Sequence, residues 1–202
     1  MSDGERTDRE SFWNWSLRAY ARPGAAPALL RLQDDLGLNV NLVLWCLWCA
    51  QVFRAPEEAL VRKAIDVTGQ WSAPIAAQLR SARIALKSPP PLADRAAAKS
   101  LRDAIKNAEL DAEKIEQKML QALAEKHLER SATGVGDQRN QKDLRSRARR
   151  ALVSYAVLMD AKRQEHFSVS LLDNAVEAIF TSEPEEQEPN ERDAAQTVLE
   201  TS

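Results

Sequence analysis

Two cysteines, Cys46 and Cys49, have the CxxC spacing used by redox pairs and by half zinc sites. A redox pair works at an exposed helix start, where the helix dipole lowers the thiol pKa, but these two lie inside the apolar run 42–50. Helix geometry also holds residues i and i+3 about 5–6 Å apart at Cβ, farther than the ~3.8 Å of a disulfide. The chain has no second CxxC and no nearby histidine to complete a zinc site. We therefore expect both thiols to pack in a core.

The remaining residues with catalytic potential have simpler explanations. His127 and His166 come near the ends of two predicted long helices, and an antiparallel arrangement of those helices would separate them. The neighbouring carboxylates Asp34-Asp35 are expected to face solvent, and Glu57-Glu58 to stabilise the positive end of a helix. None has the partners that acid–base catalysis needs. The sequence predicts no catalytic residue, no metal ligand and no cofactor.

A basic segment between residues 139 and 150 contains six arginines and lysines against one acid. One interpretation is contact with RNA, DNA or an acidic protein surface, although no aromatic residues are interleaved for stacking on bases. The other is internal pairing, either with the acidic tail or with acids such as Glu109, Asp111, Glu113 and Glu116. At helical spacing, the most continuous basic row is Arg139, Lys142, Arg145 and Arg149.

Five helices are predicted between residues 9 and 88, which hold all five tryptophans and form a tryptophan-rich module. The predicted ranges are 9–21, 25–36, 40–54, a fourth from Pro56 to about 71, and a fifth restarting at Ser72 and Pro74. Gly37 is placed for a left-handed C-terminal cap and Asn39 for an N-cap. The helix 40–54 is apolar on every side, so the others are expected to pack around it.

The composition changes after the break at Ser88-Pro-Pro-Pro91. Helices are predicted at about 94–129, 140–165 and 169–180, with the first two folded as a long antiparallel hairpin. These form a second part, 92–181, and the acidic residues 182–202 are expected to be a disordered tail. Apolar residues recur at spacings of 4, 3, 4, 3 along the first long helix and predict a coiled-coil seam. The seam residues proposed for partner contact are Leu101, Ile105, Ile115 and Met119.

Composition limits the class of protein. The 202 residues have a formal net charge of -2, which makes no case for nucleic acid or membrane binding by the whole molecule. Glycine is scarce and alternating β-branched runs are missing, so an all-α fold is expected. The polar N-terminus lacks the apolar core of a secretory signal, and two cysteines fit a reducing compartment. We expect a cytoplasmic protein without a membrane-spanning segment.

Two stretches carry a family resemblance. They read FWNWSLRAYARPG at residues 12–24 and LQDDLGLNVNLVLWCLW at residues 32–48. The chain resembles a family of small proteobacterial proteins carrying a domain of unknown function, most specifically over residues 11–90. The resemblance implies a bacterial, helical, cytoplasmic protein and assigns no reaction.

Three function classes follow from these observations. The first is a non-enzymatic interaction or adaptor protein that binds a protein partner or itself through the hairpin. The alternative is an apolar small-molecule binding protein, or an enzyme, with a pocket in the tryptophan-rich module. Ser16, Asn39, Asn41 and Gln51 would supply its polar contacts. A weaker alternative is a nucleic-acid-associated protein that uses the basic row.

Overall fold

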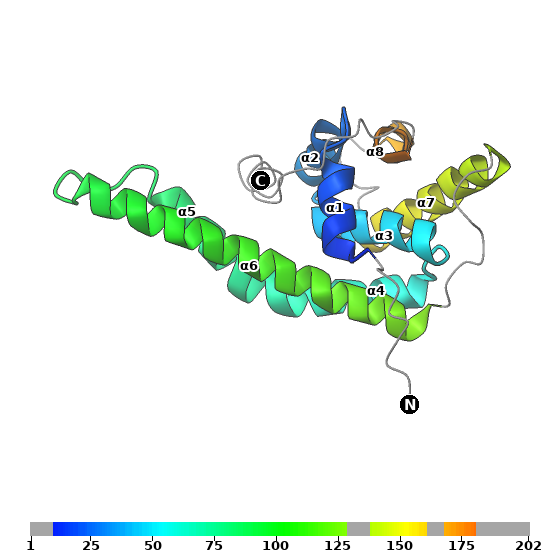
Figure 1. The fold of residues 1–202 in the computed structure, drawn as a ribbon, viewed down its shortest axis with the longest axis horizontal. Coiled ribbons are helices and arrows are strands. Elements are labelled where there is room, and N and C mark those ends of the chain that lie inside the picture. Colours follow the sequence, from blue (N-terminus) through cyan, green and yellow to red (C-terminus); the bar gives the residue numbers. More distant parts are fainter. Residues whose placement is uncertain (1–9, 129–137, 161–167, 181–202) are drawn as a thin grey trace.

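The computed structural model describes residues 10–128, 138–160 and 168–180, without the side chains of 138–140. This part of the chain is built from helices and contains no strand, which confirms the predicted all-α fold (Figure 1). The elements are α1 (Phe12–Tyr20), α2 (Ala25–Leu36), α3 (Val40–Val52), α4 (Glu58–Trp71), the π-helical turn η1 (Ser72–Ala76), α5 (Ala77–Ala85), α6 (Arg95–His127), α7 (Gln138–Leu158) and α8 (Val169–Phe180).

Local capping fixes the first helices where the sequence predicts them. The Ser11 side chain accepts a hydrogen bond from the backbone N–H of Asn14 and begins α1. Gly37 ends α2 at φ +66°, a left-handed conformation that costs glycine little. Asn39 begins α3 by accepting from the N–H of Leu42 at 3.2 Å. Both predicted caps are confirmed.

Helix α3 is the centre of the molecule. Every residue from Leu42 to Ala50 is buried, and α1, α2, α4, α6 and α7 all contact this helix. Burying each large apolar side chain contributes roughly 1.5–3 kcal/mol. The central position predicted from the uninterrupted apolar run is confirmed.

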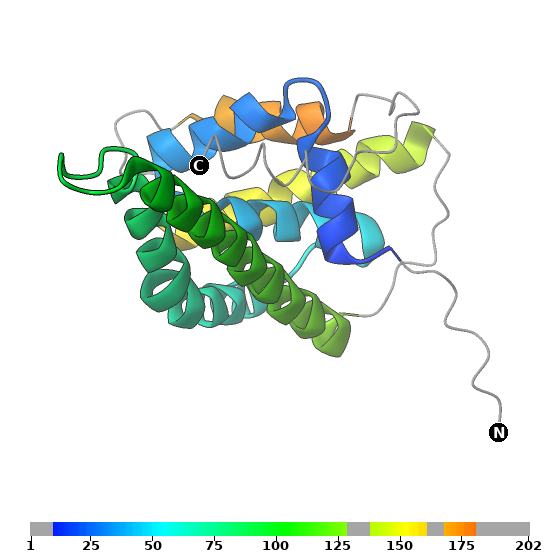
Figure 2. The same ribbon diagram turned by 60° about the vertical axis from the view of Figure 1, so that its left-hand side comes forward.

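Helices α4 and α5 are joined through η1 into one bent rod, rather than separated by a break at Ser72 (Figure 2). Pro74 lies inside η1 and has no backbone N–H to donate to the regular helical ladder. A π-helical turn absorbs this defect and lets the chain continue as a helix. The rod therefore brings Ser72 and Arg80 to the same side of α6.

The long hairpin does not consist of α6 and α7, the two helices that were predicted to form it. Helix α6 runs back along α5 and α4, and together α5 and α6 form an arm that projects from the body (Figure 1). Helix α7 packs instead along α3 and α8. The reason is that α7 presents Ala148, Leu152 and Tyr155 to the core, while α6 buries a polar face against α5. Helix α7 ends at Leu158, before the predicted residue 165, and Asp160 follows with φ +55°.

One hydrophobic core contains residues from both sides of the triple proline. It joins residues of α1–α4 with Leu120 and Ala124 of α6 and with the inner faces of α7 and α8. Helix α8 closes the body by packing on α2 and α7. The proline break thus lies at the tip of the arm. The predicted tail, 182–202, lies outside the described residues. In the helices that the structure describes, none combines the length and apolar character required to cross a bilayer.

Candidate ligand-binding site

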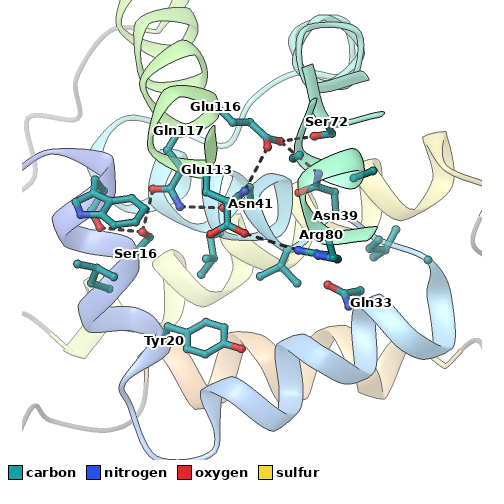
Figure 3. Close-up of a pocket in the computed structure, with 18 of the residues that line it drawn as sticks. Ser16, Tyr20, Gln33, Asn39, Asn41, Ser72, Arg80, Glu113, Glu116 and Gln117 are labelled. Carbon is teal, nitrogen blue, oxygen red and sulfur yellow. Dashed lines mark hydrogen bonds and ion pairs between the residues drawn. The ribbon is translucent and has the colours of Figure 1, made fainter. Parts of the chain in front are cut away.

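A cavity of about 420 Å³ opens between four segments of the chain. Helix α1, the turn between α2 and α3, the bent rod η1–α5 and helix α6 each form one wall (Figure 3). Leu17, Leu38, Leu44 and Ile84 supply apolar surface. The labelled polar side chains around it are Ser16, Tyr20, Gln33, Asn39, Asn41, Ser72, Arg80, Glu113, Glu116 and Gln117.

Glu116 is the best-satisfied acid of this cavity. Its carboxylate accepts from the hydroxyl of Ser72 at 3.0 Å and from the side-chain amides of Asn39 at 3.3 Å and Asn41 at 3.5 Å. Burial raises the pKa of Glu116, and these three hydrogen bonds oppose the increase. The carboxylate therefore ties the start of α3 and the start of η1 to α6.

Gln117 is held in one orientation by two neighbours. Its carbonyl oxygen accepts from the hydroxyl of Ser16 at 2.9 Å, and its amide donates to Asn41 Oδ1 at 2.9 Å. The same hydroxyl lies 2.8 Å from the backbone carbonyl of Trp13, so its single proton is shared between two acceptors. These bonds position α1 against α6 and fix the cavity wall before any ligand arrives.

Two arginines of α5 form ion pairs with Glu109, one turn of α6 before Glu113. Glu109 is fully buried, and its carboxylate accepts from Arg83 Nε at 2.5 Å and from Arg80 Nε at 3.0 Å. Arg83 is 4% exposed, so this pair is removed from water. A buried pair of this kind needs close geometry to offset the desolvation of both charges.

Glu113 differs from the other acids because its carboxylate keeps unused acceptor capacity. Its side chain is 8% exposed, and the ion pair found for it among the described residues is with Arg80 Nη2 at 3.7 Å. Figure 3 shows this carboxyl group beside Arg80, facing the space that Tyr20 and Gln33 border from the other side. Burial raises the pKa of Glu113 to about 7; Glu109 and Glu116 add to the increase and Arg80 opposes it.

A second unused group also belongs to the cavity lining. The indole Nε1 of Trp13 is buried and has no hydrogen-bond partner within the described part of the chain. Native proteins rarely leave buried donors unsatisfied, and those that do occur call for an explanation. The residues around the cavity thus include one indole N–H without a hydrogen-bond partner and one under-used acidic acceptor.

Some residues of this site were predicted from the sequence. Ser16, Asn39 and Asn41, suggested as polar contacts of a pocket, do line the cavity, whereas Gln51 accepts from the indole of Trp15 at 2.7 Å elsewhere. Arg80 and the acids of α6 were not predicted to be site residues. The signal that would have found the acids is the spacing of 4 and 3 between Glu109, Glu113 and Glu116, which places them on one helix face.

The proposed partner seam lies on a neighbouring face of α6. Leu101 is 53% and Ile115 43% exposed, and Ile105 and Met119 are partly buried. At 3.6 residues per turn, this face lies roughly a quarter of a turn from the buried acidic face. The seam residues take no part in the cavity.

Two of the four residues of the basic row form ion pairs with α8. Arg145 pairs with Glu177 at 3.5 Å and Arg149 with Asp173 at 2.6 Å, while Lys142 is exposed. Helix α8 therefore supplies the acids for the internal pairing, rather than α6, whose Glu109, Glu113 and Glu116 face the arginines of α5 or the cavity. The side chain of Arg139 lies outside the described residues.

The cysteines behave as core residues. Cys46 and Cys49 are free and buried, and burial raises the pKa of both thiols well above the ordinary value. His127 is exposed, and His166 lies outside the described residues. Within the described parts of the chain, no three or more metal-ligating side chains come together.

The fold and cavity together define an all-α protein with a preformed pocket bordered by buried carboxylates. Residues 11–120 match the family described as Protein of unknown function (DUF2390), and the chain belongs to this family. That range begins at the cap of α1 and includes every residue that lines the cavity. No curated protein and no solved structure matches the chain.

Proposed function

We propose that this chain is a non-enzymatic binding protein whose cavity takes a small molecule with a protonated amine. The observation that carries the proposal is the buried carboxylate of Glu113, which faces the cavity with one ion pair as long as 3.7 Å. An ionised carboxylate can accept about four hydrogen bonds. A ligand ammonium placed here would supply donors that the chain does not.

The local charge favours a cation over an anion. Glu109, Glu113 and Glu116 face two arginines, Arg80 and Arg83, so one negative charge is in excess when every group is ionised. Burying an excess charge is costly, and Glu113 accordingly binds a proton readily, with its pKa raised to about 7. A monocationic ligand would balance the cluster and keep Glu113 ionised.

The rest of the cavity favours an apolar body on that ligand. Leu38, Leu44 and Ile84 line the walls, and the ring of Trp13 adds aromatic surface. The volume of about 420 Å³ falls in the usual range for small-molecule sites, roughly 300–1,000 Å³. Tyramine, phenethylamine and hexylamine have the required combination of one amine and an apolar chain or ring.

The test is calorimetric titration of the full chain with these three amines at pH 8, where Glu113 is mainly ionised. Phenethyl alcohol and 3-phenylpropionate serve as neutral and anionic counterparts of similar size. We expect at least one amine to bind with Kd below about 1 mM and at least tenfold more tightly than its counterparts. Equal affinity for phenethylamine and phenethyl alcohol, or no binding by any of the three amines, would refute the proposal.

Two variants separate the site from general electrostatics. Glu113→Gln should lower amine affinity at least tenfold, because the ligand charge loses its counter-ion. Asp111→Asn removes the same charge from an exposed position on the same helix and should leave the affinity unchanged. A matching loss in both variants would mean that the amine responds to the net charge of α6 rather than to the cavity.

A second candidate function is self-association through the seam of α6. The exposure of Leu101 and Ile115 favours it, because apolar residues at heptad spacing form coiled coils with a like face on a second copy. Light scattering should then show a mass that rises with concentration and returns to that of a monomer in Leu101→Asp and Ile115→Asp. Asn107→Asp, exposed on α6, is the control. A monomeric mass for the unmodified chain at all concentrations would exclude this function.

We place either activity in the cytoplasm. The support is that Cys46 and Cys49 are free and buried, as expected of a protein that folds in a reducing compartment.

A further inference from the structure

A second cavity is lined by residues on both sides of the turn between α5 and α6. This turn forms the tip of the arm in Figure 1. The cavity has a volume of about 730 Å³, is open to solvent, and is bordered by the end of α5, the turn at Ser88 and Pro89, and the first turns of α6. We call it the tip cavity. Its lining contains four cationic side chains, namely Lys87, Arg95, Lys99 and Arg102, and no acidic one.

The fold holds these four cations on facing surfaces. Arg95, Lys99 and Arg102 follow each other at spacings of four and three, which places them on one face of α6. Lys87 reaches the same space from the end of α5. The stiff run Pro89–Pro91 joins the two helices and restricts how far they can separate.

Nearby acids balance only part of this charge. Asp94 accepts from the N–H groups of Ala96 at 2.8 Å and Ala97 at 3.1 Å, so it caps α6. Asp103 binds Lys99 at 2.8 Å, and this bond together with the fields of Lys99, Arg102 and Lys106 lowers its pKa. The tip cavity therefore keeps a positive potential.

Arg102 provides the strongest evidence that this cavity binds a ligand. Its Nε is buried and has no hydrogen-bond partner among the described residues. A guanidinium nitrogen shielded from water without an acceptor is unfavourable, and an anion paired with the Arg102 guanidinium as a whole would offset that cost. The basic row of α7 differs, because Arg145 and Arg149 already have acids of α8 as partners.

We propose that the tip cavity binds a phosphate group, with the Arg102 guanidinium as a donor and Lys87, Arg95 and Lys99 as surrounding cations. Arginine and lysine are the side chains best suited to phosphate oxygens. The hydroxyl of Ser88, also in the lining, adds a neutral donor. The volume accommodates more than one phosphate group, so inorganic pyrophosphate is a suitable probe.

The test is titration of the full chain with pyrophosphate at low ionic strength. We expect Kd below about 1 mM, at least a tenfold loss in Arg102→Gln and in Arg95→Gln, and no loss in Lys118→Gln, which removes the same charge from an exposed site farther along α6. Unchanged melting temperatures will show that the variants fold. No binding of pyrophosphate, or an equal loss in Lys118→Gln, would overturn the proposal.

A second arm of the experiment identifies the source of the phosphate. Leu92 is fully exposed near the tip cavity, so phosphatidylglycerol vesicles are compared with phosphatidylcholine vesicles by co-sedimentation. Binding to pyrophosphate without either vesicle assigns the site to a free phosphate compound. Additional binding to phosphatidylglycerol that is lost in Arg102→Gln assigns it to a lipid headgroup.

Discussion

The indole Nε1 of Trp45 donates a hydrogen bond to the backbone carbonyl of Leu120 at 2.8 Å and so joins the centre of α3 to α6. Trp71 makes the same kind of bond with the carbonyl of Ala112 at 3.0 Å. The cavity residues of α6, from Glu113 to Gln117, lie between these two attachment points. Two tryptophans of the N-terminal helices therefore set the rotation and height of the helix that carries the carboxylates.

Trp45→Phe should destabilise the protein by about 1–3 kcal/mol beyond the loss of ring volume, because it removes a buried hydrogen bond. Trp48→Phe is the matched control. Trp48 lies on the same helix and is equally buried, yet its Nε1 has no partner among the described residues. Urea denaturation of both variants measures the difference. If Trp48→Phe loses as much stability as Trp45→Phe, the hydrogen bond of Trp45 does not anchor α6.

Arg83→Met should cost about 3 kcal/mol, because it leaves the buried carboxylate of Glu109 with Arg80 alone. The double variant Arg83→Met/Glu109→Leu should be more stable than Arg83→Met, since the unpaired charge is then removed as well. Thermal and urea unfolding provide the comparison. If the double variant is less stable than either single variant, the coupling inferred from the geometry is wrong.

The stability of the protein should depend on pH through Glu113. Its pKa is raised from 4.5 to about 7, so the folded protein binds a proton more tightly than the unfolded chain does. The resulting stabilisation is complete below about pH 4.5 and is lost as the pH rises through about 7; it amounts to about 3 kcal/mol at most. Glu113→Gln should remove this dependence and be more stable than the unmodified chain at pH 8.

The free energy of unfolding of Glu113→Gln and of the unmodified chain is measured by urea denaturation at pH 5, 6, 7 and 8. The difference between these two free energies separates the effect of Glu113 from that of other titrating groups. A difference that stays constant over this range would disprove the raised pKa. Amine binding should have the opposite dependence and strengthen from pH 6 to pH 8, because only ionised Glu113 attracts the ligand.

Arg149→Gln should reduce stability by less than about 1 kcal/mol, although Arg149 lies 2.6 Å from Asp173. The two side chains are 52% and 43% exposed, so water and salt screen the pair. Chemical denaturation at low and high salt is the measurement. A loss comparable to that of Arg83→Met would show that the pair between α7 and α8 contributes far more than its exposure implies.

Cys46 and Cys49 should not react with a thiol reagent such as dithionitrobenzoate while the protein is folded. Both are buried, and burial raises the pKa of each thiol, so the reactive thiolate is scarce. Two equivalents should be modified in urea. Rapid modification of either cysteine without denaturant would contradict the packing of α3.

The sequence by itself determined the helices, their caps and the central place of α3. Gly37, Asn39 and the apolar run 42–50 act through backbone conformation, local hydrogen bonds and the need to cover apolar surface, and all of these can be read within a few residues. The same local reasoning placed Cys46 and Cys49 in the core.

Only the tertiary structure decided which face of α6 is buried and which helix lies beside it. Hydrophobic periodicity selected the face of Leu101 and Ile115, but the structure buries Glu109, Glu113 and Glu116 instead. Those acids can be buried because Arg80 and Arg83, more than 20 residues earlier, arrive opposite Glu109 after the turn at the prolines. The spacing of the acids places them on one face of α6, but no sequence pattern links them with Arg80 and Arg83. The cavity therefore becomes visible only when the helices are packed together.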